Sequence, residues 1–152
     1  MLRRLIAFAL AAGLFTSVAR AQEVAGTWAV DFDQTVRRTA DGGDQVVARG
    51  KAVLVIEVKG DSAFGTWTTQ SSGLRVVKLR GTHKGNSVKL VSDVQTGSSI
   101  TRAGTTTITF INTYEATVTG DAIVGTTTTQ SQNAQPAATR ARALKFEGKR
   151  VL

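Results

Sequence analysis

The chain has 152 residues, a formal net charge of +8 at pH 7, a single proline and no cysteine. Without cysteine, disulfides, thiol catalysis and thiolate metal sites are excluded, and the length fits one ordinary domain. The many glycine, threonine and valine residues favour strands joined by glycine turns.

Residues 1–21 have the pattern of a secretory signal peptide. Arg3-Arg4 precede an apolar run over 5–15, and Ala19-Arg20-Ala21 supplies the small residues of a cleavage site. The run is shorter than the roughly 20 residues that span a bilayer. We therefore expect an exported protein, bacterial periplasmic or extracellular, whose single domain covers 22–152; an uncleaved N-terminal anchor is the alternative.

After the leader, alternating apolar and polar residues predict β-strands throughout. The expected strands cover 26–33, 46–58, 64–70, 74–82, 88–95, 105–119, 123–130 and 140–150. The stretches 34–44, 97–104 and 132–139 are polar and are expected to form loops or a frayed hairpin end. About eight strands in sequence predict an all-β, antiparallel up-and-down barrel, because closure removes the free edges of an open meander.

Residues 58–71 recur at 118–131, with nine of fourteen positions identical. Each copy contains Gly-Asp at a position where a two-residue hairpin turn needs a positive φ, and glycine supplies it. The turn explains the repeated glycine and aspartate without a ligand. The differences are more informative for function: Trp67 is replaced by Thr127, and Phe64 by Val124.

No stretch carries a recognisable catalytic, cofactor or metal motif, so we expect no enzyme and no cofactor. His83, the only histidine, lies beside the Gly85-Asn86 turn, and no signature of a nucleophile or an orienting acid accompanies it. Asp31 and Asp33 share one face of the first strand, where they could bind a cation or flank a substrate bond. That face lies opposite the apolar one, so a soluble outer face is the expectation.

The first strand opens on Gly26-Thr27-Trp28, which resembles the Gly-x-Trp signature of lipocalins and the Gly-Thr-Trp of avidin-like proteins. The chain also resembles small bacterial exported proteins of lipocalin-like type. The lipocalin resemblance implies that Trp28 packs at the closed end of a barrel against a basic residue, here Arg150 or Lys149. A Thr-Asp-Tyr second signature, a C-terminal helix and the Trp-rich strands of avidins are not found in the sequence.

The longest strand points to a ligand site. Asn112 and Tyr114 interrupt its apolar face, as polar groups that orient a ligand do in an otherwise apolar pocket. The alternative is that they satisfy each other inside a filled core. With Trp67, Phe64 and Phe110 they form the predicted ligand-binding set. The expected function is an exported, non-enzymatic protein that holds a small apolar or amphipathic ligand in the barrel lumen.

A second hypothesis rests on basic residues near the C-terminus: Arg140, Arg142, Lys145, Lys149 and Arg150. With Arg75, Lys78 and Arg80 they could form a patch for an anionic envelope polymer, lipid head groups or a protein partner. The protein would then have a structural or interaction role with a filled barrel. A solvated strand face is the other interpretation. Export argues against nucleic acid, and the threonine-rich outer face argues against a membrane-embedded barrel.

Overall fold

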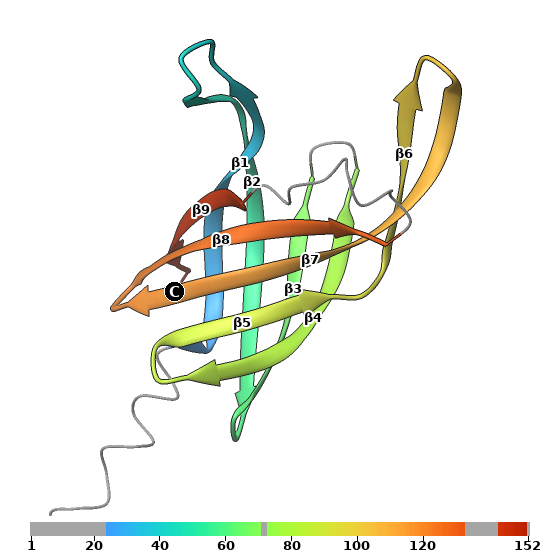
Figure 1. Ribbon diagram of the computed structural model, residues 1–152. Coiled ribbons are helices and arrows are strands. Elements are labelled where there is room, and N and C mark those ends of the chain that lie inside the picture. The colour runs from blue at the N-terminus through green and yellow to red at the C-terminus, as the bar shows by residue number, and fades with distance from the viewer. Residues whose placement is uncertain (1–23, 71–72, 133–142, 152) are drawn as a thin grey trace, which may run out of the picture.

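The computed structural model describes residues 24–70, 73–132 and 143–151, which form an all-β structure. Figure 1 shows strands wrapped around a common interior. The strands are β1 (Gly26–Arg38), β2 (Asp44–Lys59), β3 (Ser62–Thr69), β4 (Arg75–Lys84), β5 (Ser87–Ser92), β6 (Gln95–Thr101), β7 (Gly104–Thr119), β8 (Ala122–Ser131) and β9 (Ala143–Arg150). The predicted signal peptide, 1–21, and the loop predicted at 132–139 lie outside the described residues, except for Gln132.

Eight of these strands close into an antiparallel up-and-down barrel. The order runs β5-β4-β3-β2-β1-β9-β8-β7, and a β5–β7 pairing joins the two ends. The predicted fold class is therefore confirmed. Within the sheet, the pairing of β1 with β9 joins the two ends of the chain and matches Trp28 with Arg150 and Phe32 with Phe146.

The ninth strand, β6, extends a hairpin with β7 beyond the barrel. β5 and β6 pair with the same strand in succession, Val91 opposite Thr113 and Gln95 opposite Phe110. The prediction of a loop over 97–104 was wrong. A ribbon that leaves the barrel has little core to cover, so its sequence is polar and lacks a strand-like alternation.

The β1–β2 hairpin also projects, and Figure 1 shows it rising from the same end of the barrel as β6–β7. β1 runs to Arg38 and β2 begins at Asp44, so only 39–43 form the turn of the stretch predicted as a loop or frayed end. The strand pairing shifts register between Asp33 and Thr35, where β1 leaves the barrel. We call this end of the barrel, with its two projecting hairpins, the open end.

The sequence repeat corresponds to the two hairpins β2–β3 and β7–β8. Gly60 and Gly120 each begin a two-residue turn with a φ of 59°, as predicted. Counting round the closed barrel, β3 and β8 are four strands apart in either direction. The two copies therefore lie on opposite sides of the barrel, related by an approximate two-fold arrangement.

The end opposite the projecting hairpins is closed by packing and hydrogen bonds. The Arg150 guanidinium carbon lies 4.2 Å from the Trp28 ring centroid, and its Nη1 donates to the Ala25 carbonyl at 2.6 Å. Arg150 Nε lies 3.5 Å from Asp121 Oδ1. The expectation that a C-terminal basic residue packs on Trp28 is confirmed, with Arg150 as that residue.

The core fills the lumen from this closed end. Trp28, Leu54, Ile56, Leu90, Val118 and Ile123 are almost completely buried. Burying each aliphatic side chain of this kind stabilises the fold by about 1.5–3 kcal/mol. These side chains come from several strands around the barrel and fill the lumen at the closed end. Space for a ligand therefore lies nearer the open end.

Candidate ligand-binding cleft

A cleft of about 240 Å³ lies in the lumen at the open end of the barrel. Its walls come from six strands, β1, β3, β4, β7, β8 and β9. Its floor is the last layer of the core, and its rim carries polar and charged side chains. The barrel thus brings together residues that are distant in the sequence.

Trp67 is the centre of an aromatic cluster that forms the floor. Its ring centroid lies 5.4 Å from that of Phe32, 5.0 Å from Tyr114 and 5.6 Å from Phe146. The contacts with Phe32 and Phe146 are edge-on, a favoured geometry for aromatic pairs. Trp67 is only 6% exposed. The floor is therefore a packed aromatic surface, held by four strands.

Asn112 and Tyr114 supply the polar part of the wall. The Asn112 backbone N–H donates to Ser92 Oγ at 2.9 Å, where β5 ends. Thr129 Oγ1 donates to Asn112 Oδ1 at 2.7 Å, and the Asn112 side chain also hydrogen-bonds the Tyr114 hydroxyl. Since Oδ1 faces Thr129, the amide N–H₂ faces Tyr114 and donates to its oxygen. The Tyr114 O–H proton remains available to a further acceptor.

Burial raises the pKa of Tyr114 to about 12. The hydrogen bond from Asn112 and the positive charge of Arg75 act in the opposite direction and only partly offset the burial. Arg75 and Tyr114 line the same cleft. Tyr114 is therefore a neutral hydrogen-bond donor at physiological pH.

Asp33 lies in the cleft wall, which corrects its predicted place on a soluble outer face. It is 6% exposed, and its Oδ1 lies 3.4 Å from Arg49 Nε. Asp33 is the last residue before the register shift between Asp33 and Thr35, so the regular alternation of β1 ends at this position. Asp31 does lie exposed, paired with Lys51 at 3.5 Å.

Four of the five predicted ligand-binding residues line this one cleft: Tyr114, Asn112, Trp67 and Phe110. Phe64 lies elsewhere. It is 47% exposed and lines a hollow on the outer surface with Val55 and Lys78. Phe64 and Trp67 are three positions apart, an odd number, so the alternation of a strand directs them to opposite faces.

The predicted basic set does not form one patch. Lys145 and Lys149 are exposed on the outer face of β9, where Lys145 borders the cleft, and Arg150 turns inward onto Trp28. Arg140 and Arg142 lie outside the described residues. On β4, Arg80 pairs with Asp93, Lys78 is exposed, and Arg75 lines the cleft.

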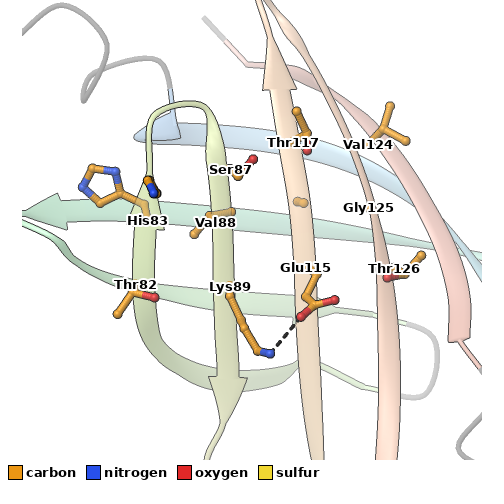
Figure 2. Close-up of a pocket in the computed structure, with 12 residues that line it drawn as sticks. Thr82, His83, Ser87, Val88, Lys89, Glu115, Thr117, Val124, Gly125 and Thr126 are labelled. Carbon is orange, nitrogen blue, oxygen red and sulfur yellow. Dashed lines mark ion pairs between the residues drawn. The ribbon is translucent and has the colours of Figure 1, made fainter. Parts of the chain in front are cut away.

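His83 ties the β2–β3 turn to β4. Its backbone N–H donates to the Asp61 carbonyl at 3.1 Å, and its ring Nε2 lies 2.7 Å from the Gly60 carbonyl. Figure 2 shows the His83 ring turned away from Glu115 and Thr126. This geometry favours the structural interpretation of His83 as a residue that holds a turn.

A larger hollow of about 440 Å³ lies on the outside of the barrel, over β4, β5, β7 and β8 (Figure 2). It is lined mainly by exposed side chains, and Lys89 Nζ pairs with Glu115 Oε1 at 2.9 Å within it. The strands curve under an open surface there, so a ligand would stay mostly solvated. The smaller luminal cleft has the enclosed aromatic floor that this hollow lacks.

The repeat explains how space arises in the lumen. Trp67 and Thr127 hold equivalent positions in the two copies, and both line the cleft from opposite sides. One copy supplies a bulky indole for the floor, and the other leaves room above it. Sequence reasoning missed Phe32, Asp33 and Arg75 as cleft residues. For Phe32 a signal existed, because it continues the inward face of Trp28 and Val30.

No family model matches the chain, and neither a curated protein nor a solved structure matches it. Among the described residues, no helix is both long and apolar enough to cross a bilayer. The same part of the chain holds no group of three or more His, Asp or Glu side chains placed to bind a metal ion. Function must therefore be argued from the cleft itself.

Proposed function

We propose that this protein is an exported, non-enzymatic binding protein of lipocalin-like type that holds a small apolar or amphipathic molecule in its barrel lumen. The observation that carries the proposal is the cleft at the open end, with an aromatic floor around Trp67 and polar groups at Asn112 and Tyr114. An apolar wall with a few convergent polar groups is the usual composition of a small-molecule site.

The size of the cleft limits the ligand. Sites that bury drug-sized molecules occupy about 300–1,000 Å³, and this one measures about 240 Å³. A single ring with a short polar substituent, or a short chain, fits such a space. A larger ligand would extend between the two projecting hairpins.

The hydrogen bond between Asn112 and Tyr114 is compatible with a ligand as well as with a filled core. It fixes both side chains before a ligand arrives, and pre-organised groups lose little entropy on binding. The free O–H proton of Tyr114 gives a ligand one donor at the boundary between the aromatic floor and the polar rim. A polar pair that served only the core would have no reason to border a cleft.

The alternative proposal, a filled barrel that binds an anionic polymer or a protein through a basic surface, has less support. The basic residues near the C-terminus separate onto different faces, and Arg150 is engaged at the closed end. The cleft also lies where a filled barrel would have core.

Mass spectrometry of molecules extracted from the purified protein tests the proposal. We expect a small organic molecule in stoichiometric amount from the natural protein. A Thr127→Phe variant should lose it, because the added ring occupies the space opposite Trp67. A Thr117→Phe variant, on the exposed outer face of β7, is the matched control and should retain it. If all three proteins fold and none carries or rebinds a small molecule, luminal binding is wrong.

A further inference from the structure

The charged groups around the cleft are unequally paired. The one carboxylate in its wall, Asp33, is already paired with Arg49, whose Nη1 also lies 3.5 Å from Glu147 Oε1. Arg75 lines the cleft on the same face of β4 as Val77, and it has no carboxylate within ion-pair distance among the described residues. The cleft therefore presents net positive charge.

Arg75 is held in place by a neutral partner. Its Nη2 donates to Gln95 Oε1 at 3.0 Å, and Gln95 Nε2 donates to the Asp93 carbonyl at 3.0 Å. An amide oriented in this way positions the guanidinium without neutralising it. Arg75 can still donate through its other N–H groups, because a guanidinium has five.

The composition of the remaining internal segments agrees with this imbalance. Residues 71–72 and 133–142 contain no Asp or Glu. They thus contribute no carboxylate side chain that could neutralise Arg75.

The polar groups of the cleft converge as hydrogen-bond donors. Tyr114 offers its O–H proton, since its oxygen already accepts from Asn112, and burial keeps the hydroxyl protonated. Arg75 is close enough to Tyr114 to affect its ionisation. A group with two acceptor oxygens and a negative charge would use both donors.

Resting on the proposed luminal function, we infer that the ligand is a small amphipathic anion, an aryl or short-chain carboxylate. Its apolar part lies on the floor formed by Phe32 and Trp67. Its carboxylate accepts hydrogen bonds from Tyr114 and Arg75. A cation of the same shape would be repelled, and a neutral amide would leave the charge unused.

Three probes of one shape test the inference: phenylacetate, phenylacetamide and 2-phenylethylammonium. Isothermal titration calorimetry at low salt should show the anion binding roughly tenfold to a hundredfold more tightly than the amide, the range for charge-assisted hydrogen bonds. The cation should bind most weakly. Added salt should weaken binding of the anion and leave that of the amide nearly unchanged.

One variant and two matched controls separate the effect of the charge from an effect on the fold. Arg75→Gln should weaken phenylacetate binding severalfold and leave phenylacetamide binding unchanged. Lys78→Gln changes an exposed lysine on the same strand, β4, and Lys149→Gln changes one on β9; both variants should leave both affinities unchanged.

The outcomes distinguish the two proposals. If the amide and the anion bind equally well and Arg75→Gln has no effect, luminal binding stands and the preference for an anion is wrong. If a variant at Lys78 or Lys149 weakens phenylacetate binding as strongly as one at Arg75, the anion binds to the general positive surface, and the inference is also wrong. If no probe binds at millimolar concentration, the result counts against the luminal site itself.

Discussion

The rings of Trp67 and Tyr114 lie 5.0 Å apart, centroid to centroid, although the two residues belong to opposite halves of the chain. Trp67 comes from β3 in the first copy of the repeated hairpin, and Tyr114 from β7 in the second. Their contact forms the boundary between the filled part of the lumen and the cleft. Because of this contact, a change at the site should affect the signals of both residues.

Tyr114 is the only tyrosine of the chain, so its ionisation can be followed directly. We expect the near-ultraviolet absorbance of the phenolate to appear with a midpoint near a pKa of about 12 in the folded protein. An exposed tyrosine has a pKa of about 10. A midpoint near that value at a pH where the protein is still folded would contradict the burial of Tyr114.

The same pKa shift predicts a loss of stability at high pH. The folded state holds the tyrosine proton more tightly than the unfolded state does. The resulting contribution to the free energy of unfolding is complete below pH 10 and is lost as the pH rises towards 12. The loss should be on the order of 2 kcal/mol. The free energy of unfolding, measured with denaturant, should fall in this pH range for the natural protein and should fall less for Tyr114→Phe. Parallel pH profiles would contradict the assignment.

The contact between Trp28 and Arg150 should stabilise the closed end. Arg150→Ala removes the cation over the ring and the bond to the Ala25 carbonyl, and we expect a loss of about 2 kcal/mol in the free energy of unfolding. Arg150→Lys should retain only part of this stability, because an ammonium lacks the planar geometry of a guanidinium. Lys149→Ala, at the exposed neighbouring position, should change stability by less than about 0.5 kcal/mol. Equal effects at the two positions would contradict the described packing.

Trp67 and Phe64 provide a comparison between a luminal and an outer aromatic residue of one strand. Trp67→Ala removes the centre of the aromatic cluster, and large-to-small changes of buried aromatic residues cost about 3–5 kcal/mol. Phe64 is exposed, so Phe64→Ala should cost less than about 1 kcal/mol. Thermal or denaturant unfolding measures both. A larger loss for Phe64 would show that the faces of β3 are assigned wrongly.

Local sequence patterns were sufficient to predict the barrel. The alternation around Trp28 and along 105–119 gives the inward face of two strands, and the Gly-Asp turns fix the hairpins. The partner of Trp28 followed from the lipocalin resemblance, which left Arg150 and Lys149 open. Strand alternation would have chosen Arg150, because even-numbered positions of the last strand, such as Phe146, face inward.

The cleft was only partly predictable because its residues depend on register and on closure. The shift after Asp33 is a single extra residue, and no periodicity in the sequence marks it. Arg75 and Tyr114 line one cleft only once the barrel has closed through β5 and β7. Phe64 was assigned to the site because it lies close to Trp67 in the sequence, although alternation places it outside.

The central claim is that a small molecule binds between Trp67 and the open end. The chain contains two tryptophans, one at each end of the lumen, so two-dimensional NMR shows two indole N–H signals that can be followed together. On titration with phenylacetate, we predict that the Trp67 signal shifts saturably while the Trp28 signal stays in place. A Trp67 signal that does not move, or that moves no more than that of Trp28, would contradict the luminal site.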